Sequence, residues 1–369
     1  MATATTLSGP ISADAADAII GSVEPEPDAY VRICDVYGAG WWYLPGTETC
    51  IRLNGDLRVQ YETLKYHDSI QGEDKSSAHD ADYRARLNIR LNNETELGTL
   101  ASRFRFTSAA SAGTGTRPGE GHYDLVSSRL NNLDAPTRVD WAVISIAGLR
   151  TGYSDNYWNT AGNGGFYQAR YDGPYGDIEG LYVDYTFSAN GWNATIGAES
   201  GEVSGEPGNP DLYGGITYSN NGLYLAGIVY RDSSADAYAW KARFDYDISS
   251  IADGLAVGGW YMSDDGRTDY VKGHAWGVTA KIELTEKILL FGGIGGFEDN
   301  YFDKAGVCGT NGNTACGLNT GYDTWTLGVA FKITNNIFIQ PEYQVVTYDD
   351  ENLTQRNFGQ FNLRIETTF

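Results

Sequence analysis

The sequence predicts an all-β fold: a transmembrane antiparallel β-barrel of about sixteen strands whose third long loop folds inward. Three observations support this prediction: a composition rich in glycine and aromatic residues, the absence of long apolar runs, and a hydrophobic pattern with a period of two. Glycine contributes 46 of the 369 residues, and tyrosine contributes 26. Aromatics make up 13% of the chain, and together with so much glycine they favour many short strands and turns over helices.

The charge balance excludes two classes of protein. The chain has 26 Lys and Arg against 48 Asp and Glu, which gives a net charge of −22. Because an acidic surface repels phosphate, we expect no nucleic-acid partner. Disorder is also disfavoured, because hydrophobic residues reach 41% of the chain and can build a folded structure.

No stretch approaches the roughly 18 consecutive apolar residues that mark a transmembrane helix. The most apolar windows, 251–262 and 288–297, are interrupted by glycines or an acidic residue. A membrane β-barrel needs no such run, because its strands alternate lipid-facing and lumen-facing residues. The sequence therefore excludes a helical membrane protein and leaves a barrel open.

Alternation of apolar and polar residues begins directly after Cys50. Between residues 51 and 64, odd positions such as Leu53 and Leu57 are apolar, whereas the even positions are mostly polar or charged. In 83–91 and 100–107, arginines alternate with apolar side chains. Such alternation is typical of a sheet with one apolar and one wet face. The predicted strands are 51–64, 83–91, 100–107, 138–147, 148–154, 181–188, 192–199, 212–219, 223–231, 237–248, 254–263, 269–284, 287–299, 322–333, 336–348 and 358–369.

The connections between these strands are of two kinds. Those at 219–222 and 334–336 are tight, whereas those at 64–82, 107–137 and 299–321 are long, polar and rich in Gly and Asp. Short turns on one rim and long loops on the other are typical of outer-membrane barrels. An even strand number also lets an antiparallel barrel close with no open edge in lipid.

The last predicted strand shows the two faces clearly. Phe361, Leu363 and Ile365 share one face, and Asn362 and Arg364 share the other. In a soluble β protein, such as a secreted lectin, the apolar face would be core, and one strand alone does not decide between the two. A barrel of about sixteen strands has an interior too wide for side chains to fill. We therefore expect the polar face to line water, the apolar face to meet lipid, and Tyr and Trp to gather at the bilayer interfaces.

The sequence predicts that the chain is divided into three segments. Residues 1–28 form a poorly ordered N-terminal or processing segment, residues 29–50 a disulfide-bounded segment, and residues 51–369 the barrel. The N-terminus lacks the basic region and clean apolar core of a signal peptide, but Ser12–Asp17 has the small-x-small form of a cleavage site. No repeat or linker divides the barrel.

The four cysteines fall into two local pairs, Cys34 with Cys50 and Cys308 with Cys316. Three pairings are possible, and proximity in the sequence favours the local one, with free thiols as the alternative. Two disulfides would place the protein in an oxidising compartment outside the cytoplasm.

A set of arginines falls on the polar face of the first three predicted strands. If the barrel closes as predicted, these side chains form a basic wall on one side of the lumen. Alternatively, they pair with acids such as Asp56 and Glu62 and solvate the wall. The predicted pore-lining set is Arg52, Arg58, Arg84, Arg86, Arg90, Arg103 and Arg105.

The tract Ser154–Gly180 is too long for a turn and is rich in aromatic and acidic residues around Arg170. Because exposed aromatic patches are costly in water, we expect this tract to fold into the lumen. Its carboxylates would then face the arginines and set a transverse field that favours small polar solutes. The alternative is an extracellular loop that packs on itself. The aromatic residues are Tyr157, Trp158, Phe166, Tyr167, Tyr171 and Tyr175, and the acidic residues are Asp155, Asp172, Asp177 and Glu179.

We expect no metal site and no cofactor. Neither cysteine spacing matches a zinc site, and the four histidines are scattered. The acidic clusters at 264–265, 298–303 and 349–351 lack an EF-hand pattern and are expected to be solvated loops. Alternatively, they bind divalent cations shared with anionic lipid headgroups.

Three stretches of the chain resemble the general porins of alphaproteobacteria. They are the tract Tyr30–Cys50, the tract Asn93–Leu100 and the last strand, which ends in Phe369. The resemblance implies a sixteen-stranded homotrimer in the outer membrane of a Gram-negative bacterium, embedded among outer-membrane lipid and lipopolysaccharide. It further implies passive passage of small hydrophilic solutes, a constriction formed by the third loop, and a terminal aromatic residue that acts as an assembly signal. The tract Cys308–Cys316 departs from the family pattern.

Function in such a protein would reside in pore width and lining charge. A substrate-selective channel for sugars or anions is the alternative, because the aromatic loop and the arginines would serve it equally well. A barrel enzyme is disfavoured, because no Gly-x-Ser-x-Gly elbow surrounds Ser127 and Ser128, the serines nearest to His122. The ion preference stays open, since acidic loops favour cations at the mouths and arginines favour anions within.

Overall fold

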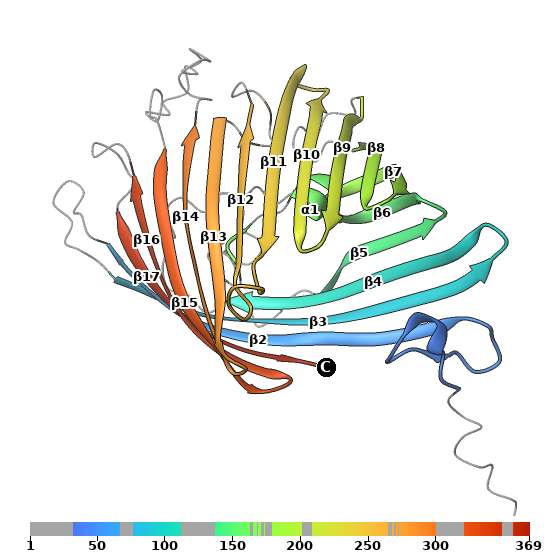
Figure 1. Ribbon diagram of the computed structural model, residues 1–369, viewed down its shortest axis with the longest axis horizontal. Helices are drawn as coiled ribbons and strands as arrows, with labels where there is room; N and C mark the ends of the chain where they lie inside the picture. The colour runs from blue at the N-terminus through green and yellow to red at the C-terminus, as the bar shows by residue number, and fades with distance from the viewer. Residues whose placement is uncertain are drawn as a thin grey trace, which may run out of the picture.

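A single antiparallel sheet that closes on itself dominates the computed structural model (Figure 1). The structure describes residues 32–66, 77–111, 137–162, 165–167, 169–170, 173, 179–200, 209–264, 268, 271, 273–299, 321–348 and 357–369. Sixteen strands, β2 to β17, form a ring in which each strand pairs with its neighbours in sequence. The pairing of β17 with β2 closes the ring, with a register that runs from Phe358 opposite Tyr66 to Thr368 opposite Asp56.

The ring contains every strand that the alternation predicts. The bounds are β2 (Cys50–Tyr66), β3 (Ser77–Thr95), β4 (Gly98–Ser111), β5 (Thr137–Ile146), β6 (Leu149–Asp155), β7 (Glu179–Ala189), β8 (Trp192–Glu199), β9 (Asp211–Asn220), β10 (Leu223–Asp232), β11 (Ala237–Asp247), β12 (Ala256–Ser263), β13 (Gly273–Thr285), β14 (Ile288–Asp299), β15 (Tyr322–Thr334), β16 (Ile337–Tyr348) and β17 (Phe358–Thr368). β3 begins six residues before its predicted start at Tyr83. Its early outward positions hold His79 and Ala81, which are not large apolar residues. The hydrophobic alternation therefore begins only at Tyr83, whereas the backbone pairing with β2 begins at Ser77.

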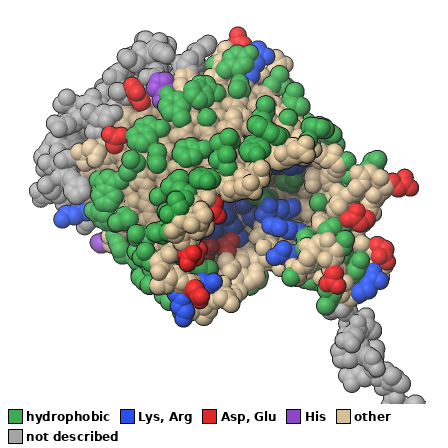
Figure 2. Space-filling model, viewed as in Figure 1, with side chains coloured by type: hydrophobic (Ala, Val, Ile, Leu, Met, Phe, Trp, Pro, Cys, Tyr) green, Lys and Arg blue, Asp and Glu red, His purple; other side chains and the backbone are tan. Residues whose placement is uncertain are grey.

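The outer and inner faces of the ring have opposite chemistry. Outward side chains such as Ile196 and Tyr61 are large, apolar and solvent-exposed, at 71% and 52%. Their inward neighbours on the same strands are polar, and Gln60 and Glu62 are each only 2% exposed. Figure 2 shows hydrophobic side chains over the outer surface and Lys and Arg side chains gathered in a hollow. The predicted arrangement of an apolar outer face and a polar lumen is therefore confirmed.

Two-residue turns join neighbouring strands along one rim. Asn190-Gly191 joins β7 to β8, and Asn221-Gly222 joins β9 to β10; all four residues have positive φ. Asn tolerates this conformation and Gly adopts it without a steric penalty, and the resulting type I′ turn matches the twist of a hairpin.

Residues 32–49 form a short N-terminal cap, which packs at the same rim, where β2 begins and β17 ends. It contains a single 3₁₀ turn, η2 (Asp35–Tyr37), and a two-residue strand, β1 (Trp42–Tyr43), that pairs with the start of β2 outside the ring (Figure 1). The predicted disulfide between Cys34 and Cys50 is present. The Tyr37 hydroxyl donates a hydrogen bond to Glu94 of β3, and partial burial together with this bond raises the pKa of Tyr37.

Some sequence-based expectations fall on parts of the chain outside the described residues. These are the poorly ordered segment 1–28, and the second cysteine pair, Cys308 and Cys316. Among the described residues, no helix is both long and apolar enough to span a membrane.

Removing the first disulfide should loosen the cap and leave the ring closed. In the double variant Cys34→Ser/Cys50→Ser, the cap loses a covalent link across a separation of 16 residues, a constraint that typically contributes about 3 kcal/mol. The ring keeps its β17–β2 pairing. We expect chymotrypsin, which cleaves after aromatic residues such as Tyr37 and Trp41, to cleave the cap faster, with the folded barrel band unchanged on an unheated gel. The matched control is Cys308→Ser/Cys316→Ser, and equal cleavage of the cap in both double variants would contradict the prediction.

Candidate functional site

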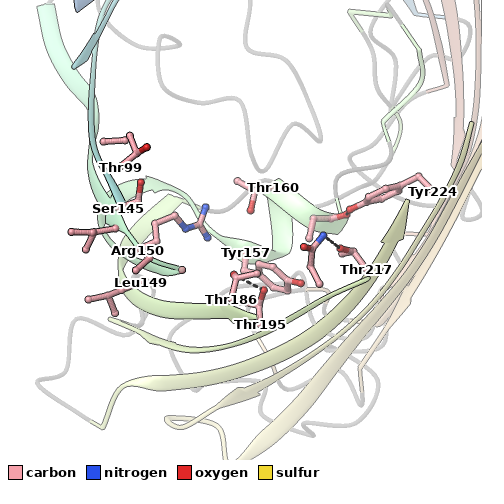
Figure 3. Close-up of a pocket in the computed structure, with 16 residues that line it drawn as sticks. Thr99, Ser145, Leu149, Arg150, Tyr157, Thr160, Thr186, Thr195, Thr217 and Tyr224 are labelled. Atoms are coloured by element: carbon pink, nitrogen blue, oxygen red, sulfur yellow. Dashed lines mark hydrogen bonds between the residues drawn. The ribbon is translucent and has the colours of Figure 1, made fainter. Parts of the chain in front are cut away.

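The described residues between β6 and β7 lie inside the barrel, as the sequence predicts. This segment begins with one short helix, α1 (Tyr157–Gly162). In Figure 3, Tyr157 and Thr160 of α1 lie over Thr186, Thr195 and Thr217 of the inner wall. The segment therefore divides the lumen instead of extending from the rim.

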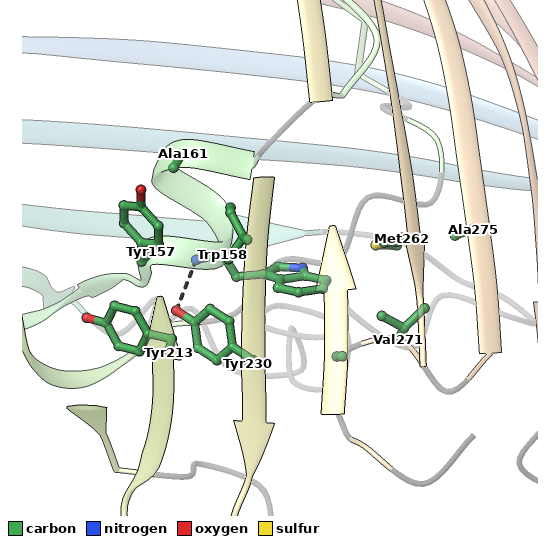
Figure 4. Packing of buried hydrophobic residues seen from close by; sticks show 10 residues of the cluster. Tyr157, Trp158, Ala161, Tyr213, Tyr230, Met262, Val271 and Ala275 are labelled. Atoms are coloured by element: carbon green, nitrogen blue, oxygen red, sulfur yellow. Dashed lines mark hydrogen bonds between the residues drawn. The ribbon is translucent and has the colours of Figure 1, made fainter. Parts of the chain in front are cut away.

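Stacked aromatic rings attach α1 to the wall (Figure 4). The ring of Tyr157 stacks on Tyr213 at a centroid distance of 5.7 Å, and Tyr213 stacks on Tyr230 at 4.8 Å. Trp158 meets Tyr230 edge-on at 5.6 Å, and its backbone N–H donates to the Tyr230 hydroxyl at 3.1 Å. Aromatic pairs of this kind contribute about 0.5–1.5 kcal/mol each beyond the area that they bury. The start of the inward segment is thus fixed in place.

Glycines in the wall make room for the aromatic rings of the segment. A Cβ atom on Gly215 would lie 2.5 Å from Cε1 of Tyr157, and one on Gly293 would lie 2.3 Å from Cδ1 of Phe166. Both distances are far below van der Waals contact. Phe166 fills the space over Gly293 and packs against Trp260 at a centroid distance of 5.4 Å. Part of the high glycine content therefore serves the inward segment.

The later part of the segment is bonded to the opposite side of the ring. The Tyr167 hydroxyl donates to Oδ1 of Asp245 on β11 at 2.6 Å. The backbone N–H of Arg170 donates to Oε2 of Glu342 on β16 at 2.7 Å, and its Nε lies 3.5 Å from Oε1 of Glu62 on β2. Burial and the Asp245 contact raise the pKa of Tyr167, so this phenol stays a donor. The segment consequently crosses the lumen from β6 to β16 and β2.

The seven predicted arginines all lie on β2, β3 and β4, and three of them are ion-paired. The carboxylate that pairs with each of these three lies on an adjacent strand. These pairs agree with the alternative that part of the set is structural. The pairs are Arg58 with Glu366 at 3.0 Å, Arg84 with Asp56 at 2.9 Å, and Arg105 with Asp140 at 2.7 Å.

The other four, Arg52, Arg86, Arg90 and Arg103, have no carboxylate partner within 4.0 Å in the described part of the chain. The strand register places Arg52 opposite Arg90, and Arg90 opposite Arg103. The guanidinium of Arg103 lies 3.8 Å above the ring of Trp141, which is a cation–π contact. Among the described residues, three adjacent strands therefore present to the lumen a row of arginines that no carboxylate pairs with.

Two of the predicted loop carboxylates stand beside this wall. Asp155 ends β6 and Glu179 begins β7, and the two residues are directly paired across the strands. Oε1 of Glu179 lies 3.8 Å from the Arg105 guanidinium. Both carboxylates are thus neighbours of the basic wall, at the two ends of the segment. Asp172, Asp177, Tyr171 and Tyr175 lie outside the described residues.

A polar network where β2 meets β17 was not identified from the sequence. Gln360 and Asn362 donate to the two carboxylate oxygens of Glu62 at 3.1 and 3.0 Å, and Arg364 donates to Gln60 at 2.8 Å. The alternation does place all these residues on the polar face. Their partnership depends on the β17–β2 register, however, and 298 residues of sequence separate Gln360 from Glu62.

Within the described residues, no group of three or more His, Cys, Asp or Glu side chains could hold a metal ion. Of the acidic clusters, Asp264, Glu298 and Asp299 are described, and the Asp264 carboxylate accepts hydrogen bonds from Thr268. His122, Ser127 and Ser128 lie outside the described residues.

Comparison with known proteins identifies the family of this chain. A family model described as "Porin subfamily" matches residues 17–366. The chain is 34% identical over 262 residues to "Porin Omp2b" of Brucella suis and of Brucella abortus. These alignments cover 64% of this chain and 66% of each relative.

Solved structures with low sequence identity share the fold. The outer membrane channel DcaP of Acinetobacter baumannii is 12% identical and has a TM-score of 0.63, over 89% of this chain and 99% of that one. Salmonella typhi OmpF is 11% identical with a TM-score of 0.61, over 87% and 98%. The anion-selective porin from Comamonas acidovorans is 12% identical with a TM-score of 0.59, over 87% and 100%.

Filling the space over Gly293 should detach the inward segment. In Gly293→Val, the new side chain occupies the position of the Phe166 ring, so we expect the bond after Arg170 to become accessible to trypsin in the folded barrel. The matched control is Gly227→Val on β10, where an added Cβ atom meets nothing within 4 Å. If both variants resist trypsin as the wild type does, Phe166 does not anchor the segment.

Proposed function

Because the chain belongs to the porin subfamily, we propose that it forms a water-filled pore for passive diffusion of small hydrophilic solutes and ions. The protein is an integral β-barrel of the outer membrane of a Gram-negative bacterium. The observation that carries the proposal is the inverted chemistry of the ring, with large apolar side chains outside and buried polar side chains inside. A polar lumen open to water offers a path that lipid denies to such solutes.

The inward segment sets the width of this pore in our proposal. It enters at Asp155, crosses the lumen and is bonded to Glu342 and Glu62 on the far wall. Because the segment is fixed at both ends and stacked on the wall, it acts as a rigid constriction and not as a gate. Solutes pass in the space between the segment and the arginine wall of β2 to β4.

We propose a channel and not an enzyme, with no cofactor. A diffusion pore needs only width and lining charge, and the features described here supply both. A substrate-selective channel is the second candidate. It is favoured by the row Arg52, Arg90 and Arg103, since uncompensated guanidinium groups in a lumen attract anions.

The protein works as a homotrimer among outer-membrane lipid and lipopolysaccharide in this proposal. Its large exposed apolar outer surface requires cover by lipid or by another subunit. The acidic balance of the chain, with a net charge of −22, resides largely outside the arginine wall. Acidic residues at the mouths are screened over a Debye length of about 8 Å at physiological salt, whereas charges inside a narrow lumen are screened less. The arginines therefore influence ion preference more than their number suggests.

Single-channel recording tests the pore directly. The refolded protein in a planar bilayer should give large, ohmic conductance steps that appear in threes, because each protomer of a trimer carries its own lumen. The control is the same preparation after heat denaturation. Absence of conductance from a barrel that still migrates as a folded band would overturn the diffusion-pore proposal.

Neutralising the unpaired arginines should shift the ion preference. In Arg86→Gln/Arg90→Gln/Arg103→Gln, the lumen loses positive charge that no described carboxylate offsets, so we expect the reversal potential in a salt gradient to move toward cation preference. Glu179→Gln should move it toward anion preference. The matched control is Arg231→Gln, an exposed residue paired with Asp236 near a loop, whose effect should be small. A triple variant with an unchanged reversal potential would place these arginines outside the ion path.

A further inference from the structure

A separate cavity lies between α1 and the inner wall, next to the rim of short turns. Its volume is about 630 Å³, which falls within the range of small-molecule sites. The walls come from the rim ends of β4 to β10, and Tyr157, Thr160 and Ala161 of α1 form the roof. Figure 3 shows this space with Arg150 at one end and Tyr224 at the other. A solute that has passed the inward segment meets this cavity before it leaves the lumen.

Hydroxyl and amide groups cover the floor of the cavity in adjacent pairs. The hydroxyls of Thr186 and Thr195 are 2.8 Å apart, and Nδ2 of Asn193 donates to the Thr217 hydroxyl at 3.2 Å. A hydroxyl can donate one hydrogen bond and accept two. Each of these threonines therefore keeps hydrogen-bonding capacity that faces the cavity.

Tyr157 brings a buried polar atom to the same space. Its side chain is 6% exposed, and its phenol oxygen has no hydrogen-bond partner of normal geometry, although the Thr195 hydroxyl lies next to it. A buried polar atom without a partner is costly, so a ligand that bonds to it gains free energy. Tyr224 is held by its hydroxyl, which donates to the carbonyl of Ala161 at 2.7 Å. The cavity thus combines two fixed aromatic rings with hydroxyl groups.

The charge of the cavity selects among possible ligands. Among its described lining residues, Arg150 is the only charged side chain. Its guanidinium bonds both carboxylate oxygens of Asp184, at 2.6 and 3.2 Å, so the pair is neutral overall. The cavity therefore differs from the arginine wall and favours an uncharged ligand with many hydroxyl groups.

We propose that this cavity is a binding subsite for a neutral polyhydroxylated solute, of the size of a mono- or disaccharide. Threonine and asparagine groups exchange hydrogen bonds with its hydroxyls, and Tyr157 and Tyr224 contact its apolar faces. The inference deepens the proposed pore function and depends on it. Weak binding at this position would raise the local concentration of such a solute on one side of the constriction without closing the ion path.

The test is block of ion current by sugar in the full-length channel. Current in KCl is recorded while glucose or maltose is added, against a betaine solution of equal viscosity. The wild type should show a decrease that saturates. In Thr186→Val/Thr195→Val, both members of a hydrogen-bonded pair are removed together, so neither threonine leaves the other unpaired, and the half-blocking concentration should rise roughly tenfold. Tyr157→Phe keeps the ring stack and should shift this concentration in the same direction.

A matched control separates the cavity from the lumen in general. Thr324→Val removes a buried hydroxyl from the inner wall of β15, outside the cavity, and should leave the half-blocking concentration unchanged. The threonine variants should keep the wild-type conductance in KCl without sugar. If the threonine double variant fails to fold, Tyr157→Phe decides the question.

The outcomes are distinct for the two proposals. A wild-type current that falls only as far as the viscosity of the solution explains overturns the subsite and leaves the diffusion pore intact. A half-blocking concentration that is the same in the wild type and in both cavity variants has the same meaning. Absence of conductance in KCl from the folded protein overturns the pore, and with it the subsite.

Discussion

The need to pair every backbone N–H and C=O group in lipid determines the architecture of this protein. Water is absent from the hydrocarbon layer, so an open sheet edge would leave a row of unsatisfied polar groups. The β17–β2 pairing, which extends over eleven residue pairs from Phe358 to Thr368, removes both edges at once. Closure of the ring also brings the N-terminal cap, the start of β2 and the end of β17 to one rim, where the Cys34–Cys50 disulfide and the Tyr37–Glu94 contact hold the cap in place.

Closure of sixteen strands produces a lumen that side chains alone do not fill. The inward segment occupies part of this space, and its attachment explains two unusual features of the composition. Of its described aromatic residues, Tyr157, Trp158 and Phe166 are buried because they pack on the wall, as Tyr157 does on Tyr213. The wall accepts them because glycines such as Gly215 and Gly293 carry no Cβ atom at the points of closest approach. Aromatic and glycine enrichment are thus two parts of one packing arrangement.

Charge in the lumen is organised by strand register. Ladder pairing sets Arg52, Arg90 and Arg103 side by side, while Arg58, Arg84 and Arg105 meet carboxylates. Two kinds of surface result in the lumen: a row of arginines on β2 to β4, and a hydroxyl-lined cavity beneath α1 that shares strand β4 with this row. In our proposal, the first favours anions by charge, and the second binds uncharged polar solutes through hydrogen bonds.

The sequence by itself determined the number and order of the strands, the face that each side chain occupies, and the local disulfide between Cys34 and Cys50. These properties follow from local rules, because alternation with a period of two needs only the residues of one strand and its turn signals. It also indicated that the tract after the fifth predicted strand turns inward, since six aromatic residues there have no stable place in water. Only the tertiary structure decided which arginines lack a carboxylate partner among the described residues, which residues surround Glu62, and where the cavity beneath α1 lies. Those contacts join residues that are far apart in the chain, and they depend on the register at which sixteen strands close, which no single strand encodes.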